Sequence, residues 1–238
     1  MTEILHARAK LTLSLRVTGV RHDGYHLLES EMVTLDLADR LTVGPGDGLT
    51  VTGLGADGPV PGDDDNLVRR ALRLVGRQAE VHLDKRIPTG AGLGGGSADA
   101  AAILRWAGCR DAGLAARLGA DVPFCLNGGR ALVSGVGEVV RPLPLEEVAG
   151  RVYTLLTPPF HVSTVEVYRA WDALGGPTGD HGNDLEPAAL HVRPDLAGWR
   201  DALGQASGET PRLAGSGGTW FVPGAHPGPG RRVVKVEG

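Results

Sequence analysis

The stretch PTGAGLGGGSAD, residues 88–99, is the strongest local indication of function in this chain. Its five glycines are Gly90, Gly92, Gly94, Gly95 and Gly96, and an alanine-rich segment with helical composition follows them. Glycine lets a backbone approach a ligand closely. The start of a helix offers unpaired N–H groups and the positive end of the helix dipole. The residues therefore favour a phosphate-binding loop, although a tight strand–helix turn without a ligand stays open.

This loop differs from two common nucleotide-binding motifs. It lacks the lysine of G-x-x-x-x-G-K-[ST], which excludes a P-loop. It also lacks the G-x-G-x-x-G spacing with an acidic residue about 20 positions later, which argues against a Rossmann site. Ser97 is expected either to cap the following helix or to contact a phosphate or its metal ion.

Periodicity places strands and helices around the loop. Alternating residues predict a strand over 8–18. The other expected elements of the first half are a strand, turn and strand over 31–43, a loop with short strand pieces over 44–63, a helix from Asn66 with Asp65 or Asn66 as its cap, a strand over 79–87, a short helix before Gly119, a further element beginning in LGADVPF, and a strand pair over 130–144.

The character of the chain changes after Pro144. The expected elements there are a strand over 151–159, helices over 162–174 and 195–204, a strand–turn–strand over 212–223 and a short terminal strand. We place a domain boundary near 144–150, which predicts an α/β chain of two domains, residues 1–146 and 147–238.

Composition excludes several classes of protein. The chain has 238 residues with 24 Lys+Arg against 28 Asp+Glu, so a nucleic-acid partner is not expected. No apolar run approaches the ~18 residues of a membrane helix, and the first residues do not resemble a signal peptide. Cys109 and Cys125 lack metal or redox spacing and are expected to be reduced and structural. We therefore expect a cytoplasmic protein without a membrane partner.

Two charged residues are candidates for catalysis. The chain contains 21 Arg but only three Lys, namely Lys10, Lys85 and Lys235. A lysine in this sequence therefore indicates a position where a compact ammonium group is needed. Lys10 lies on the polar face of the predicted strand, where a surface role and a functional role are equally open. Asp121 precedes Val122-Pro123, and a helix N-cap is preferred there over a general base.

Aromatic and glycine-rich segments give weaker signals. Tyr25 and His26 follow a glycine turn and are suited to stacking on a base and bonding its edge, but ordinary strand packing is the preferred interpretation. The turn Gly215-Ser216-Gly217-Gly218 is explained equally well by a hairpin.

Taken in order, these segments resemble the GHMP kinase superfamily. The segments are AKLTLSLRV (9–17), DGYH (23–26), DNLVRRA (65–71), KRIPTGAGLGGGSADAAAIL (85–104), GADVPF (119–124), GNDLE (182–186) and AGSGG (214–218). DGYH, AGLGGGSADAA and GADVPF together resemble the branch that phosphorylates the 2-hydroxyl of 4-diphosphocytidyl-2-C-methyl-D-erythritol in the non-mevalonate isoprenoid pathway. The resemblance implies a two-domain α/β fold with ATP and the cytidyl substrate in the cleft between the domains.

The resemblance also implies roles for individual residues. ATP would be bound by Asn66, Pro88, Gly90, Gly92, Leu93, Gly94, Gly95, Gly96 and Ser97. Asp121 would be the general base, and Lys10 would pair with it and keep it ionised. The cytidyl substrate would contact Thr12, Tyr25, His26, Tyr168, Gly215, Ser216 and Gly217, with the cytosine between the rings of Tyr25 and Tyr168. No metal-ligand cluster is apparent, so Mg²⁺ is expected to arrive with ATP. The protein is expected to be a monomer or a homodimer.

Three departures from the family pattern keep alternatives open. Thr12 stands where the pattern has an asparagine that would reach the acceptor. The stretch 108–118 is short, and the residues after 222 are too few for the usual closing helix and strand, which predicts an exposed sheet edge. The alternatives are another GHMP kinase with a small alcohol acceptor and a GHMP-fold binding protein that does not catalyse.

Overall fold

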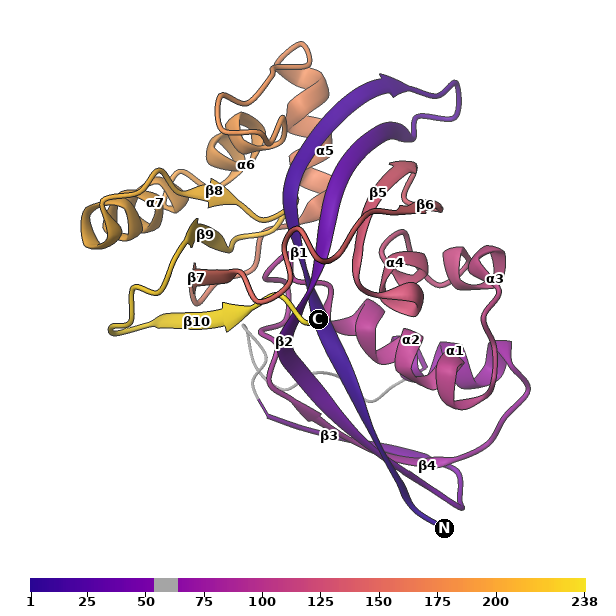
Figure 1. The fold of residues 1–238 in the computed structure, drawn as a ribbon. Helices are drawn as coiled ribbons and strands as arrows, with labels where there is room; N and C mark the ends of the chain where they lie inside the picture. Colours follow the sequence, from indigo (N-terminus) through magenta and orange to yellow (C-terminus); the bar gives the residue numbers. More distant parts are fainter. Residues whose placement is uncertain (54–63) are drawn as a thin grey trace.

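The computed structural model describes residues 1–53 and 64–238, and their strands form two sheets (Figure 1). The first sheet contains β1 (Glu3–Val20), β2 (His26–Gly44), β3 (Gly48–Gly53), β4 (Glu80–Lys85), β5 (Arg130–Gly135) and β6 (Val139–Pro142). The second contains β7 (Val152–Leu156), β8 (Arg212–Leu213), β9 (Trp220–Pro223) and β10 (Arg231–Lys235), in the order β10-β7-β9-β8.

Seven helices accompany these strands in the described part of the chain. They are α1 (Leu67–Leu74), α2 (Gly95–Trp106), α3 (Ala112–Ala116), α4 (Val122–Asn127), α5 (Thr164–Ala173), α6 (Glu186–Val192) and α7 (Leu196–Ser207). A core formed with α1, α2 and α4 lies against the first sheet, and α5 to α7 share a core with the second sheet. No helix of residues 1–53 and 64–238 is both long and apolar enough to cross a membrane.

The hairpin of β1 and β2 is the central element of the fold. Its long strands pair antiparallel from Glu3↔Val43 to Val20↔His26 and curve between the two groups of helices (Figure 1). β2 also pairs with β5 near its start and with β4 near its end. A third core, which includes Leu11, Leu35 and Phe221, joins this hairpin to the second sheet.

The last strand closes the second sheet and ties it to the first. The Lys235 backbone N–H donates to Asp36 Oδ1 at 2.9 Å, and that of Glu237 donates to the carbonyl of Thr34 at 2.9 Å. The expected short terminal strand is therefore present as β10, and no helix lies among residues 224–238. At the other edge lies β8, whose two-residue length limits pairing with another chain.

Most expected elements are present, with two instructive differences. Residues 31–43 form no turn, because β2 stays paired with β1 along this whole stretch. The pairing register shifts between Arg8 and Lys10, so the chain continues as one irregular strand instead of turning. Helix α6 was not predicted, since it is short and follows a glycine-rich loop. Of the loop expected over 44–63, β3 is described and residues 54–63 lie outside the described residues.

Candidate active site

The glycine-rich loop joins β4 to α2 and forms the wall of a pocket of about 600 Å³. All the residues predicted to bind ATP line this pocket: Asn66, Pro88, Gly90, Gly92, Leu93, Gly94, Gly95, Gly96 and Ser97. Gly94 is the N-cap of α2 in the left-handed region, with φ +68°. The first N–H groups of α2 are consequently available to an anion.

Two glycine turns pack backbone against backbone at this pocket. A Cβ on Gly92 would lie 2.3 Å from the carbonyl oxygen of Ala214, and one on Gly217 would lie 2.3 Å from the Gly92 nitrogen. Asn183 holds the second turn through its Nδ2, which donates to the carbonyls of Leu213 at 2.8 Å and Gly215 at 2.7 Å. The AGSGG turn therefore supports the loop, and Asn183 in the GNDLE segment supports the turn.

Lys10 and Asp121 meet beside the loop. Lys10 Nζ lies 3.4 Å from Asp121 Oδ2 and donates to Thr12 Oγ1 at 2.9 Å. The Lys10 backbone N–H donates to the carbonyl of Leu93 at 3.0 Å, and a Cβ on Gly94 would lie 2.8 Å from Lys10 Cγ. The Lys10 side chain is buried, whereas that of Asp121 is 32% exposed. One cation is therefore fixed between the loop and an accessible carboxylate.

The structure shows that neither Asp121 nor Ser97 caps a helix through its side chain. Asp121 occupies the N-cap position of α4, but its side chain makes no capping hydrogen bond and faces Lys10 instead. Ser97 lies inside the first turn of α2, since Gly94 is the cap, and its position lines the pocket. Asn66 does cap α1, with its Oδ1 accepting from Val68 N at 2.9 Å. Neither Asp121 nor Ser97 is thus accounted for by helix capping.

A buried charge cluster that the sequence did not reveal lies beneath the loop. Lys85 Nζ is paired with Asp39 Oδ2, and it donates to Asp99 Oδ2 at 2.7 Å. Asp39 Oδ1 accepts from the backbone of Ile87 at 2.8 Å, so it also holds the strand that leads into the loop. Asp99 Oδ1 is buried without a hydrogen-bond partner. The scarcity of lysine was the available signal for Lys85.

We predict that Asp99→Asn changes the pH dependence of stability. Burial raises the pKa of Asp99 to about 7, although the charge of Lys85 opposes the shift. A carboxyl whose pKa is raised on folding contributes stability at low pH that is lost as the pH rises from about 4 to about 7. Asparagine does not titrate, so the variant does not lose this part of its stability as the pH rises. The free energy of unfolding of Asp99→Asn relative to wild type, from urea titrations, should therefore be more favourable at pH 8 than at pH 5. A pH-independent difference would contradict this prediction.

The expected cytosine-binding residues lie on β2, α5 and the turn before β2. Tyr25 is 63% exposed. His26 packs against Tyr168 at a centroid distance of 4.7 Å, and its Nε2 lies 2.8 Å from Asp172 Oδ1. Burial raises the pKa of the Tyr168 hydroxyl, and the charge of Asp121 raises it further.

The structure brings together some predicted residues and adds others. Lys10, Thr12, Asp121 and Gly215 share one region with the loop, since a Cβ on Gly215 would lie 3.3 Å from Lys10 Nζ. Ser216 Oγ bonds Thr164 Oγ1 at 2.8 Å at the start of α5. No contact joins Tyr25 to Tyr168 in the described part of the chain. Sequence reasoning missed Asp172, Asn183, Lys85, Asp39 and Asp99.

Both cysteines are free thiols, as expected. Cys125 is buried in α4, and burial raises its pKa to about 12. A thiol with this pKa stays protonated near neutral pH and is unreactive.

Comparisons with known proteins identify the family to which this chain is similar. The family described as "GHMP kinases N terminal domain" matches residues 66–129. The 4-diphosphocytidyl-2-C-methyl-D-erythritol kinase of Paracoccus denitrificans (strain Pd 1222) is 42% identical over 235 residues, which cover 90% of this chain and 84% of the relative. The protein of the same name from Rhodopseudomonas palustris (strain ATCC BAA-98 / CGA009) is 39% identical over 91% of this chain and 86% of its own.

Solved structures show the same fold over the whole chain. A crystal structure of 4-(cytidine 5'-diphospho)-2C-methyl-D-erythritol kinase superposes with a TM-score of 0.76 at 31% identity and covers 100% of both chains. A homoserine kinase from Cytophaga hutchinsonii ATCC 33406 superposes with a TM-score of 0.59 at 20% identity, which shows the fold alone.

The fold is that of a GHMP kinase, as the sequence predicted. Within that class, the chain belongs to the 4-diphosphocytidyl-2-C-methyl-D-erythritol kinase family.

Proposed function

We propose that the chain transfers the γ-phosphoryl group of ATP to the 2-hydroxyl of 4-diphosphocytidyl-2-C-methyl-D-erythritol, a step of the non-mevalonate isoprenoid pathway. The observation that carries the proposal is the position of Asp121, whose Oδ2 lies 3.4 Å from Lys10 Nζ. Lys10 is in turn packed against the glycine loop. A carboxylate, a cation and a phosphate loop thus meet in one region.

In this mechanism Asp121 takes the proton of the 2-hydroxyl. The hydroxyl oxygen then bonds to the γ-phosphorus, and the bond from that phosphorus to the β–γ bridging oxygen breaks, which releases ADP. Phosphoryl transfer has a loose transition state, so positioning and charge stabilisation dominate catalysis. Lys10 and the N–H groups of α2 supply positive potential at the transferred group.

Thr12 has a specific part in this arrangement. Its hydroxyl accepts from Lys10 Nζ at 2.9 Å and both side chains are buried. Thr12 therefore fixes the Lys10 ammonium, in addition to the acceptor contact implied for this position.

The residues present fit a Mg²⁺ ion that binds mainly through the nucleotide. The described residues contain no group of three or more His, Cys, Asp or Glu that could hold a metal ion. Ser97, at the pocket wall, offers one hydroxyl ligand. When bound, the ion neutralises charge on the phosphates. ATP itself would be held by the loop, with the adenosine near Asn66.

The cytosine is assigned to the region of Tyr25, His26 and Tyr168. The Tyr25 ring is exposed, which suits it to stacking on a base, and the Arg21 guanidinium lies over it at 6.0 Å from the ring centroid. His26 Nε2 is engaged by Asp172, so its Nδ1 is the atom left to bond the cytosine edge. Gly215, Ser216 and Gly217 would support the diphosphate of the acceptor. The two free cysteines support a reducing, cytoplasmic compartment, and we expect a monomer or a homodimer.

Tyr25→Ala should raise the KM for the cytidyl substrate by about 5- to 150-fold, because stacking of a base on an aromatic ring contributes ~1–3 kcal/mol. Tyr25→Phe keeps the ring and should retain a KM near wild type. The KM for ATP should stay unchanged in both variants. Steady-state kinetics with each substrate varied in turn would check this. Equal KM values for the cytidyl substrate in Tyr25→Ala and Tyr25→Phe would show that the Tyr25 ring does not stack on the cytosine.

The function is tested by measuring ADP release from ATP-Mg²⁺ with four acceptors. These are 4-diphosphocytidyl-2-C-methyl-D-erythritol, plain methylerythritol, mevalonate and homoserine. Turnover confined to the cytidyl substrate is expected. Turnover with one of the small alcohols instead would favour another GHMP kinase. ATP binding without turnover on any acceptor would favour a non-catalytic binding protein.

A further inference from the structure

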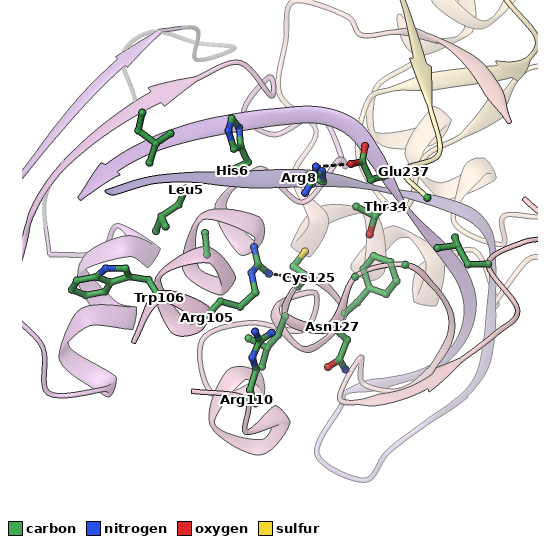
Figure 2. A pocket seen from close by; sticks show the side chains of 18 of the residues that line it. Leu5, His6, Arg8, Thr34, Arg105, Trp106, Arg110, Cys125, Asn127 and Glu237 are labelled. Atoms are coloured by element: carbon green, nitrogen blue, oxygen red, sulfur yellow. Dashed lines mark hydrogen bonds and ion pairs between the residues drawn. The ribbon is translucent and has the colours of Figure 1, made fainter. Parts of the chain in front are cut away.

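A second pocket, of about 660 Å³, lies apart from the glycine loop (Figure 2). Its walls come from the start of β1, the last turn of α2 and the segment after it, and the end of α4. This volume is in the range of small-molecule sites. None of the residues assigned to ATP, to the cytidyl substrate or to catalysis lines this pocket.

Three arginines converge on this pocket. Arg8 comes from β1, Arg105 from α2 and Arg110 from the segment after α2, and Figure 2 shows Arg105 and Arg110 pointing toward the strand that carries Arg8. Burial lowers the pKa of the Arg105 guanidinium, and the charges of Arg110 and Arg8 lower it further. Arginine nevertheless stays protonated. Of the three, Arg105 is the partly buried cation, and Arg8 and Arg110 are exposed.

The two acidic side chains that line the pocket each have a hydrogen-bond partner. Glu237 Oε1 accepts from Arg8 Nη2 at 2.5 Å, and Glu3 Oε1 accepts from Trp106 Nε1 at 3.0 Å. Arg105 Nη1 donates to the carbonyl of Cys125 at 2.5 Å, which uses one of its five N–H donors. Within residues 1–53 and 64–238, neither Arg105 nor Arg110 has a carboxylate partner. The pocket thus holds two guanidinium groups whose charge is not neutralised.

The remaining walls are apolar. Leu5, Trp106, Phe124 and Leu145 line the same space. A planar guanidinium binds phosphate oxygens with two parallel hydrogen bonds. An apolar wall next to it favours a ligand whose other end is a hydrocarbon or a ring. An inorganic ion would contact the arginines but would leave the apolar side chains of the wall without a packing contact.

We propose that this pocket is a second ligand site, which binds a small phosphate ester that carries an apolar group. Arg105 and Arg110 bind the phosphate, and the apolar group packs against Trp106. The site stands independently of the kinase activity, because it shares no residue with the proposed catalytic machinery.

Phenyl phosphate is a suitable probe, because it joins one phosphate to one ring. Binding is followed by tryptophan fluorescence, with saturating ADP present to occupy the glycine-loop pocket. We expect saturable binding to the wild-type protein. Trp106→Phe should abolish the fluorescence change, which locates the signal in this pocket.

Two variants test the arginines. Arg110→Gln should weaken phenyl phosphate binding by about tenfold or more, as expected for loss of a charge-assisted hydrogen bond. Arg110 is exposed, so this change should leave folding intact. The matched control is Arg117→Gln, an exposed arginine outside the pocket, and it should bind as wild type.

Three results would overturn the proposal. One is the absence of saturable binding to the wild-type protein at millimolar phenyl phosphate. Another is equal affinity in Arg110→Gln and Arg117→Gln. The third is inorganic phosphate binding as tightly as phenyl phosphate, because it would show that the apolar wall takes no part. Benzyl alcohol should not compete, and competition by it would exclude the phosphate contact.

Discussion

Asp121→Asn should lower kcat with the cytidyl substrate by about 10²- to 10⁴-fold, the usual contribution of a positioned general base. Asparagine keeps the size of the side chain and a hydrogen bond near Lys10 Nζ, but it cannot take the proton of the acceptor hydroxyl. Asp121 makes no capping hydrogen bond to α4, so the helix loses nothing. The KM for ATP and the midpoint of thermal unfolding should therefore stay close to wild type.

The matched control is Asp111→Asn on the neighbouring helix. Asp111 is a true cap, since its Oδ1 accepts from Leu114 N at 3.0 Å, and asparagine caps a helix as well as aspartate does. Activity should be unchanged in this variant. Near-normal turnover by Asp121→Asn would show that Asp121 is not the base and would move the proton acceptor elsewhere.

Lys85→Met should produce the largest loss of stability, about 3–5 kcal/mol in the free energy of unfolding. The reason is that Lys85 is buried between Asp39 and Asp99, and its removal leaves two carboxylates without a cation. Those carboxylates can relieve the charge by binding protons. The loss, measured by urea unfolding, should therefore be greater at pH 8 than at pH 5.

Lys235→Met provides the control for this change. Lys235 is an exposed residue of β10, and exposed substitutions usually change stability by no more than about 0.5 kcal/mol. If Lys85→Met and Lys235→Met had the same small effect at both pH values, the charge cluster would not be what anchors the loop.

The sequence predicted the parts of the site that are local. The glycine loop and the helix after it are contiguous, so spacing alone indicated a phosphate site over 88–97. Lys10 and Asp121 were ambiguous from the residues, and only the resemblance to a known family paired them. Their separation of 111 positions is bridged by the packing of α4 near β1, which no local pattern reports.

The cluster beneath the loop shows why the rest could not be predicted. Asp39 and Lys85 meet because β2 pairs with β4, with Arg40 opposite Asp84. Nothing in the spacing of these residues encodes that register. The contacts of Asp172 and Asn183 likewise depend on how α5 and the GNDLE segment pack in the folded chain, which the sequence pattern does not show. The proposed domain division at 146 stays a prediction.

The reaction proposed for the Lys10–Asp121 pair is phosphorylation of the 2-hydroxyl of 4-diphosphocytidyl-2-C-methyl-D-erythritol. The most direct measurement is ³¹P NMR of the reaction with ATP-Mg²⁺, run with wild type and Asp121→Asn. We expect a new phosphomonoester resonance on an intact cytidyl diphosphate with wild type, and its near absence with the variant over the same time. A wild-type reaction without that resonance would contradict the proposed activity, and a resonance equally strong with Asp121→Asn would contradict the role of Asp121 as the base.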